Sequence, residues 1–397
     1  MLKRIILIVF FAFFDVFSCQ KMHIPIFAFH GVPPGKFSTV EQFTRMKKSG
    51  IDICYTVFNS KEEIAIALNA SQRAGTKLII NIHFPQTDIL EIVKAFKDHP
   101  ALYGYALADE PGPNQFEDLK KIIYKIKELD NHNAIYINLY PNYVSKEVIN
   151  NFSYEGYLKD FVKKVPVKFI SFDHYPIVKN KTRGEWYENL EIVRNVSYQN
   201  NLPFWAFACS TIHYSYLQPT LEGLKLQQFS NLLYGAQVLQ YFTYWTLTYE
   251  ENWIKEKYGY SIVDDHGNPT LTYNIVKEVN EQIQRLAWVF LGSKVNQIYH
   301  VGNQIPTGTV ELKSIPEEFK SFSTNGKDAI VSFMSNDKIK FIIVQNKSLI
   351  NNLNLNYQIK RKLGKVNNKT GKTENLLLSK IYKSNILPGD IFIFTYK

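Results

Sequence analysis

The sequence alternates eight times between short apolar runs and stretches of helical periodicity, from residue 24 to residue 290. The apolar runs are nearly continuous, as in parallel strands that are buried on both faces. In the stretch 89–97, apolar residues at 89, 92, 93 and 96 give the helical spacing. We predict strands at 24–29, 53–58, 78–83, 103–108, 135–139, 169–172, 204–209 and 239–245, and helices at 39–48, 61–73, 89–97, 115–129, 154–164, 185–199, 221–235 and 271–290.

Eight strand–helix units in about 270 residues are the size of a (β/α)8 barrel, a TIM barrel. A doubly wound open sheet is the alternative, but the even spacing and the lack of a Gly-rich phosphate turn favour closure. From residue 293 short alternating runs are separated by Asn-Gly, Asn-Asp and Pro-Gly turns, as in antiparallel hairpins. We therefore expect an α/β barrel over 21–292, followed by a small antiparallel β-sandwich domain over 293–397.

Residues 1–20 have the pattern of a targeting segment. Lys3 and Arg4 precede an apolar core at 5–14 that is short for a membrane span. The tetrapeptide VFSC at 16–19 offers a signal-peptide cleavage site, and it also resembles a lipobox, in which Cys19 becomes the lipidated N-terminus. We expect an exported protein, periplasmic or at the cell surface, with Cys19 as its one candidate membrane anchor. Cys54 and Cys209 remain in apolar runs, which predicts buried free thiols.

The net charge of +10 raises the question of nucleic-acid binding. Residues 294–397 contain 16 Lys and Arg against seven Asp and Glu, so most of the excess lies in the last quarter. These basic residues are scattered through predicted strands, which favours a solvated surface over a phosphate-binding stripe. We expect no nucleic-acid partner, and the sequence leaves the oligomeric state open. Aromatic residues make up 15% of the chain, a composition that suits stacking on sugar rings.

Polar and aromatic residues gather at the carboxyl ends of the predicted strands. In a parallel barrel these ends form one mouth, where active sites are built. The candidate catalytic residues are two adjacent acids after the fourth strand, Asp109 and Glu110, and Asp173 after the sixth. The candidate substrate-binding residues at the other strand ends are His30, His83, Asn138, Tyr140, His174, Tyr175, His213, Tyr244 and Trp245.

The chemistry of this set favours glycoside cleavage. Carboxyl groups transfer protons, amides and imidazoles bind hydroxyls, and aromatic faces stack on sugars. The histidines stand on separate loops without the paired spacing of a zinc site, so we expect no metal. The chain also lacks a G-x-S-x-G elbow and a P-loop. Glycoside hydrolysis needs two carboxyl functions, or one and a substrate group, and no cofactor.

Four segments carry a resemblance to a known group of proteins: GYALADEP at 104–111, FISFDHYP at 169–176, PFWAF at 203–207 and QYFTYW at 240–245. They resemble secreted bacterial glycoside hydrolases with a C-terminal β-domain, related to the clan A retaining enzymes and distantly to the family 42 β-galactosidases. Clan A enzymes carry an Asn-Glu pair after strand four, whose Glu is the acid/base, and a nucleophilic Glu after strand seven. The resemblance implies that Glu110 is the general acid, with Asp109 in place of the Asn.

The chain departs from this pattern after strand seven, where FWAFACST at 204–211 contains no carboxylate. Asp173 could supply the second carboxylate, kept ionised by an imidazolium at His174. Alternatively, Asp109 could position a substrate acetamido group that attacks in place of an enzyme nucleophile, since an adjacent Asp-Glu pair resembles that of the family 20 hexosaminidases. The third interpretation is a barrel that binds glycan without cleaving it.

Overall fold

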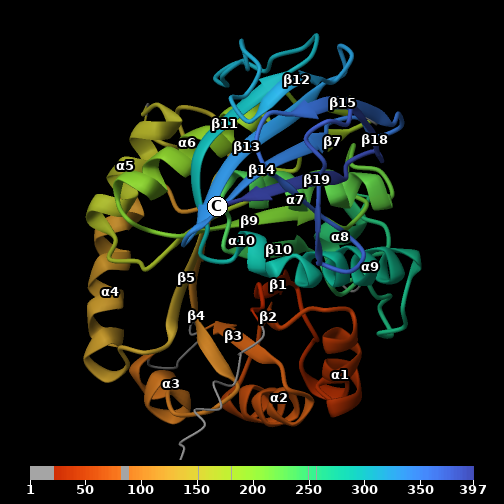
Figure 1. Ribbon diagram of the computed structural model, residues 1–397. Helices are drawn as coiled ribbons and strands as arrows, with labels where there is room; N and C mark the ends of the chain where they lie inside the picture. The colour runs from red at the N-terminus through yellow and green to blue at the C-terminus, as the bar shows by residue number, and fades with distance from the viewer. Residues whose placement is uncertain (1–21, 82–88, 151, 180, 249, 256) are drawn as a thin grey trace, which may run out of the picture.

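The computed structural model describes residues 22–397, apart from 82–88, 151, 180, 249 and 256. Eight parallel strands form a closed barrel, in which the last strand, β10, pairs with the first, β1 (Figure 1). The predicted (β/α)8 fold is therefore confirmed. The barrel strands are β1 (Ile26–Phe29), β2 (Ile53–Thr56), β3 (Lys77–Asn81), β4 (Leu102–Asp109), β5 (Ala134–Leu139), β6 (Ile170–Phe172), β9 (Phe204–Cys209) and β10 (Val238–Phe242).

Helices surround the barrel, and side chains close the first turn of several of them. Thr39, Ser60, Ser153 and Thr220 each accept a hydrogen bond from a backbone N–H of the helix that follows. The helices of the barrel are α1 (Val40–Lys48), α2 (Lys61–Ala74), α3 (Ile89–Phe96), α4 (Phe116–Leu129), α5 (Tyr154–Lys164), α6 (Glu185–Gln199), α7 (Leu221–Tyr234), α8 (Glu251–Lys255), α9 (Leu271–Arg285) and α10 (Ala287–Phe290), with 3-10 turns η1 (Gly35–Phe37) and η2 (Pro113–Gln115).

Large aromatic rings fill the part of the barrel interior that lies away from the carboxyl ends of the strands. Phe169 and Trp205 are stacked with ring centroids 3.9 Å apart, and Phe27 packs against Tyr136 at 5.2 Å. A second, larger core lies between the strands and the surrounding helices. The barrel interior is thus filled by side chains here and does not form an open pore.

Two antiparallel sheets follow the barrel, as predicted. One has the strand order β11-β13-β14-β19-β16-β17 and the other the order β12-β15-β18, with an apolar core between them. Their bounds are β11 (Lys294–Val301), β12 (Phe319–Ser323), β13 (Ala329–Asn336), β14 (Ile339–Asn346), β15 (Leu353–Ile359), β16 (Gly364–Val366), β17 (Thr373–Asn375), β18 (Tyr382–Ile386) and β19 (Ile391–Tyr396). The fold is an α/β barrel followed by an antiparallel β-sandwich.

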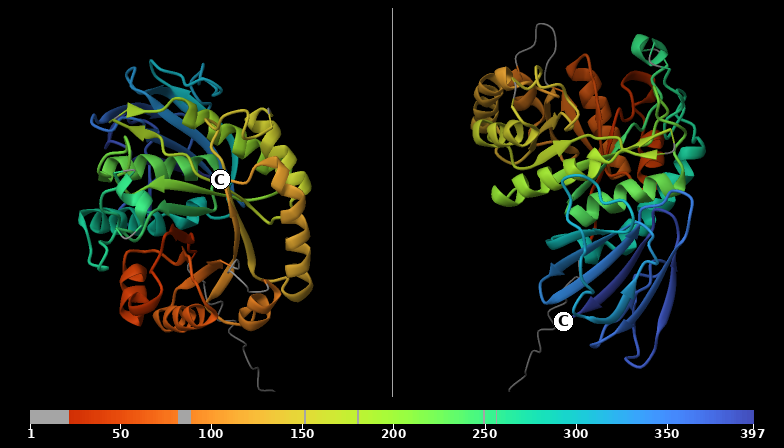
Figure 2. Two further views of the ribbon diagram at one scale, coloured as in Figure 1. Left: turned by 180° about the vertical axis from the view of Figure 1, so that it is seen from behind. Right: turned by 90° about the horizontal axis from the view of Figure 1, so that it is seen from above.

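Helix α7 joins the sandwich to the barrel (Figure 2). Nearly all of its residues are buried, because the barrel strands cover one side and the six-stranded sheet covers the other. Lys225 of α7 forms an ion pair of 3.1 Å with Asp390, and Gln282 of α9 donates to the same carboxylate at 2.8 Å. Ser230 of α7 donates to Gln345 of β14 at 2.7 Å. The two parts therefore share one buried interface.

A short hairpin that the sequence did not predict, β7 (Ile177–Val178) and β8 (Lys181–Thr182), follows β6. Cys54 and Cys209 are buried free cysteines, as predicted. The predicted targeting segment, with Cys19, lies outside the described residues. Across the residues that the structure describes, every helix is too short or too polar to cross a bilayer.

Candidate active site

The three predicted acids meet at the mouth of the barrel. Asp109 ends β4, Glu110 follows it, and Asp173 follows β6. All three line a cavity of about 280 Å³, which we call the mouth cavity. Its lining residues are Phe29, Asp109, Glu110, Asn138, Tyr143, Asp173, Tyr175, Phe207, His213, Tyr214, Tyr216, Phe242 and Tyr258.

Asn138, the penultimate residue of β5, links two of the acids. Its Nδ2 donates to Asp173 Oδ1 at 2.7 Å and to Asp109 Oδ1 at 3.2 Å. Its own Oδ1 accepts from Ser171 Oγ at 3.0 Å, and the Ser171 hydroxyl accepts from Gln240 Nε2 at 2.9 Å. This buried chain of hydrogen bonds fixes the amide so that its NH2 group faces the carboxyl groups.

Glu110 has an unusual backbone conformation for its place in the chain. Its φ of 50° lies in the left-handed region, although the residue is not glycine and precedes a proline. Its N–H donates to the Asn138 carbonyl at 2.8 Å, and the Tyr157 hydroxyl donates to the carbonyl of Pro111 at 2.8 Å. Backbone strain of this kind costs on the order of 1–3 kcal/mol and clusters at functional sites. Here it turns the Glu110 side chain into the cavity.

The surroundings of the acids raise their pKa values. Burial, followed by the charge of Asp109, raises the pKa of Glu110 to about 7. Burial also raises the pKa of Asp109, against the stabilising hydrogen bond from Asn138. A carboxyl group with a pKa of about 7 is half protonated at neutral pH, which is the property that a general acid requires.

The surroundings of Asp173 do not fit the prediction that an imidazolium at His174 keeps its carboxyl group ionised. Burial, together with the charges of Glu110 and Asp109, holds the pKa of Asp173 well above its usual range. Burial also lowers the pKa of His174 to about 3, so its imidazole is neutral at pH 7. His174 is 1% exposed, and its Nδ1 lies 3.4 Å from Asn189 Oδ1 on α6. The prediction of a charged partner for Asp173 was therefore wrong.

Aromatic rings form the walls of the mouth cavity. His213 is stacked on Tyr258 with ring centroids 4.7 Å apart, and it lies edge-on to Tyr175 at 5.8 Å. Phe29 and Phe242, the last residues of β1 and β10, pack at 6.2 Å. Flat apolar faces beside carboxyl groups suit a sugar ring, which has an apolar face and a hydroxylated edge.

The other predicted substrate-binding residues fall into two groups. Asn138, Tyr175 and His213 line the mouth cavity. His30, Tyr140 and His174 do not, although Tyr140 lies close enough to Glu110 for the acid to raise its pKa, after burial. Burial lowers the pKa of His30 to about 4. His83 lies outside the described residues.

The prediction that Tyr244 and Trp245 lie at the mouth as substrate-binding residues was wrong. Both are fully buried in the core outside the barrel, and Trp245 packs on Phe37 at 4.9 Å. The predicted strand 239–245 ends in fact at Phe242. The chain then runs beside the end of β1. There the N–H of Tyr244 donates to the Phe29 carbonyl at 3.0 Å, and the N–H of Trp245 donates to the His30 carbonyl at 2.8 Å. Phe242 takes the place at the mouth that the prediction gave to these two residues.

Sequence analysis missed the aromatic residues that reach the cavity from loops, which are Tyr143, Tyr214, Tyr216 and Tyr258. It also missed Phe29, although a signal was present. Phe27 and Phe29 stand two apart in β1, a spacing that puts both on the inner face of the barrel.

One group of potential metal ligands occurs among the described residues, and it is not at the mouth. Asp264, Asp265 and His266 place ligand atoms within 4.8 Å of one another in the loop before α9. Their carboxylates already accept hydrogen bonds, from Asn268 N of the same loop at 2.7 Å and from Thr248 Oγ1, which precedes α8, at 2.7 Å. We assign these residues to loop structure.

Comparisons with known proteins support the fold. The α-L-arabinofuranosidase of Thermotoga maritima aligns over 95% of this chain and 97% of its own, with 8% identity and a TM-score of 0.53. The β-galactosidase of the Antarctic haloarchaeon Halorubrum lacusprofundi aligns over 66% of this chain, with 11% identity and a TM-score of 0.50, and the alignment spans 58% of that enzyme. Both neighbours are glycoside hydrolases, and at these identities the likeness shows the fold alone. No family model matches the sequence, and no curated protein matches it.

Proposed function

We propose that this protein is a glycoside hydrolase whose active site is the mouth cavity. The observation that carries the proposal is Glu110, a carboxyl group with a pKa raised to about 7 in a cavity with two further acids. Glycosidases use such a carboxyl group to protonate the oxygen of the leaving group. The aromatic walls supply faces on which a sugar could stack.

In this proposal Glu110 gives its proton to the glycosidic oxygen as the bond to the anomeric carbon breaks. Positive charge then develops on the sugar ring, and a carboxylate near the ring stabilises it. Asp109 can do so, and Asp173 can do so in its ionised form, which its raised pKa disfavours. Because Asn138 donates to both, their positions are fixed before substrate binds.

The experiment that tests the proposal is a turnover screen of the purified protein on aryl glycosides and plant, bacterial and animal oligosaccharides. We expect release of reducing sugar from at least one class, and loss of that release in the Glu110→Gln variant. The sugar, the anomer and the linkage would follow from the substrate that is cleaved. Hydrolysis that survives unchanged in Glu110→Gln would argue against this active site.

The role of the second acid gives a separate prediction. If Asp173 is the base or nucleophile, Asp173→Asn should lower kcat by about 10²–10⁴-fold, as loss of a general base does, while Asp109→Asn has the smaller effect. If Asp109 instead orients a substrate acetamido group, the order reverses, and the loss is confined to N-acetylhexosamine substrates. Both variants keep a hydrogen-bonding partner for Asn138, so thermal unfolding should remain close to that of the unmodified protein.

A non-catalytic glycan-binding protein is the second candidate function, and one observation favours it. The end of β9 carries Cys209, Ser210 and Thr211, all buried, in place of a carboxylate. The Ser210 hydroxyl donates to the Thr243 carbonyl at 3.1 Å, and Thr211 Oγ1 donates to Ser261 at 3.0 Å. Binding of a glycan by both the unmodified protein and Glu110→Gln, with turnover by neither on any substrate, would support this candidate.

A further inference from the structure

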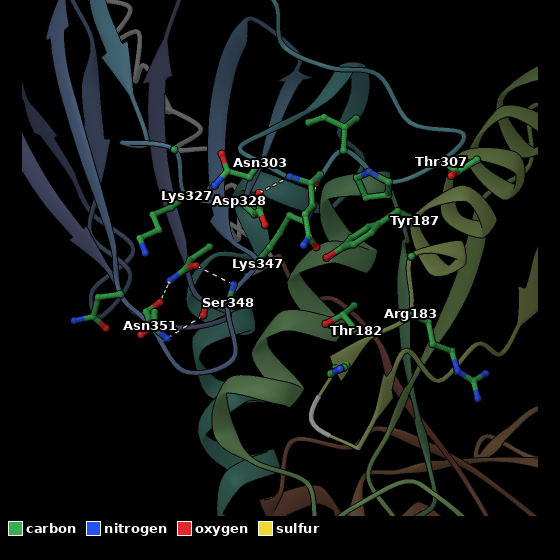
Figure 3. A pocket seen from close by; sticks show the side chains of 18 residues that line it. Thr182, Arg183, Tyr187, Asn303, Thr307, Lys327, Asp328, Lys347, Ser348 and Asn351 are labelled. Atoms are coloured by element: carbon green, nitrogen blue, oxygen red, sulfur yellow. Dashed lines mark hydrogen bonds between the residues drawn. The ribbon is translucent and has the colours of Figure 1, made fainter.

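A second cavity, of about 800 Å³, lies where the barrel meets the sandwich (Figure 3). We call it the interdomain cavity. On the barrel side it is lined by the segment 181–184 and Tyr187 of α6, and on the sandwich side by residues 303–307, 326–328, 346–348 and 351–352. Most of the lining side chains are amides, hydroxyls or charged groups.

The charge of the interdomain cavity is one-sided. Four basic residues line it, Lys181, Arg183, Lys327 and Lys347, against one acid, Asp328. None of the four forms an ion pair with a described residue. Asp328 Oδ1 accepts a hydrogen bond from the backbone of Gln304 at 3.0 Å. Asp328 also attracts Lys347 electrostatically, but one acid against four basic residues leaves the cavity with a net positive charge.

Lys347 occupies the wall between the two parts of the molecule. Its Nζ donates to the Gln304 carbonyl at 3.3 Å and lies 5.1 Å from the centre of the Tyr187 ring. Figure 3 shows Tyr187 on the barrel side, with its hydroxyl end turned toward the sandwich loop that carries Lys347. Burial lowers the pKa of Lys347 to about 8. An anion in the cavity would stabilise the ammonium form that burial disfavours.

A third cavity of about 720 Å³, which we call the linking groove, lies next to both the interdomain cavity and the mouth cavity. It shares Thr182, Lys347, Ser348 and Asn351 with the interdomain cavity and Tyr216 with the mouth cavity. Arg183 stands near this junction, with its guanidinium 4.9 Å from the centre of the Tyr143 ring and 5.6 Å from that of Tyr216. The three cavities therefore adjoin one another, in order from the acids of the barrel to the sandwich.

We propose that the interdomain cavity binds an anionic stretch of a glycan chain whose neighbouring residues reach the mouth cavity through the linking groove. This inference rests on the proposed function, because it takes the mouth cavity to be the place where the bound chain is cleaved. Uronate carboxylates and sulfate esters share the chemistry that the four basic residues recognise. The amides of Asn303 and Asn352 and the hydroxyl of Thr307 offer donors and acceptors for sugar hydroxyls.

Binding to the catalytically impaired Glu110→Gln protein tests the inference without turnover. The probes are hexagalacturonate, which carries carboxylates, a sulfated carrageenan hexasaccharide, and uncharged xylohexaose, measured by calorimetry. We expect at least one anionic probe to bind more tightly than xylohexaose, with an affinity that falls as salt is added. Equal affinity for all three probes would overturn the inference, as would equally tight binding of a single-stranded oligonucleotide of the same charge.

Matched charge variants locate the site. Lys327→Gln combined with Lys347→Gln should weaken binding of the preferred anionic probe by about tenfold or more, since two charge contacts are lost. Lys338→Gln combined with Lys362→Gln removes the same charge from exposed positions of the sandwich outside the cavity, and it should leave the affinity unchanged. Equal losses in the two pairs would contradict the site.

The outcomes separate this inference from the proposed function. Binding of an anionic probe at the interdomain cavity without hydrolysis of any substrate would support the inference and contradict the proposed enzymatic function. Hydrolysis of uncharged glycans, with no anionic probe bound, would contradict the inference and support the proposed enzymatic function. Arg183→Gln gives a further check, because its guanidinium contacts rings of both the linking groove and the mouth cavity and its loss should weaken binding of the same probe.

Discussion

Replacing Glu110 by Gln should lower kcat/KM by about 10²–10⁴-fold on an oligosaccharide, because the proton that the leaving oxygen needs is no longer supplied. The amide keeps the size of the side chain and its place at the end of β4, so substrate should still bind. Steady-state kinetics on the substrate found by the turnover screen measure the loss, and calorimetry on the same variant measures the affinity. A loss of affinity equal to the loss of turnover would assign Glu110 to binding.

The pH dependence gives a second readout of the same carboxyl group. Glu110 must be protonated to act as an acid, and its pKa is raised to about 7 by burial and by Asp109. We therefore expect kcat/KM to fall as the pH rises past about 7. Asp109→Asn removes a neighbouring negative charge, so it should move this fall to lower pH. In Glu110→Gln the fall near pH 7 should be absent from the residual activity. Its persistence there would assign the titration to another group.

Replacing Asp390 by Ala should destabilise the whole chain by about 3–5 kcal/mol, because it leaves Lys225 charged and without its partner in a buried interface. The side chains of this pair are 8% and 11% exposed, and Gln282 also donates to Asp390. The interface joins the barrel to the sandwich, so calorimetric unfolding of both parts should shift to lower temperature together.

Two variants control for that result. Glu155→Ala breaks an exposed pair with Lys159 on α5 and should change stability by about 0.5 kcal/mol or less. Lys225→Met combined with Asp390→Leu removes both charges and should regain most of the stability. A sandwich that unfolds at lower temperature in Asp390→Ala, while the barrel keeps its own transition, would show that the two parts are stabilised separately.

The sequence was sufficient to predict the barrel and the meeting of its three acids. Near-continuous apolar runs at regular intervals define buried parallel strands, and the carboxyl ends of such strands share one mouth. Asp109, Glu110 and Asp173 follow directly from that geometry. Asn138, two positions from the start of the next loop, was predicted for the same reason, and the structure shows it between two of the acids.

The remaining features depend on how loops and neighbouring side chains pack. Tyr214, Tyr216 and Tyr258 reach the cavity from loops, whose paths no periodicity encodes. Asp173 and His174 are adjacent in sequence, but consecutive side chains of an extended chain point to opposite sides. One lines the cavity and the other packs toward Asn189 of α6. The interdomain cavity could not be predicted from the sequence, because its walls come from segments more than 100 residues apart.

The most direct test of a catalytic Glu110 compares two substrates that differ only in the leaving group. One aryl glycoside of the preferred sugar carries 2,4-dinitrophenol, which departs without a proton, and the other carries 4-methylphenol, which needs one. We expect Glu110→Gln to retain most of its kcat/KM on the first and to lose about 10²-fold or more on the second. Equal losses on the two substrates would contradict Glu110 as the general acid.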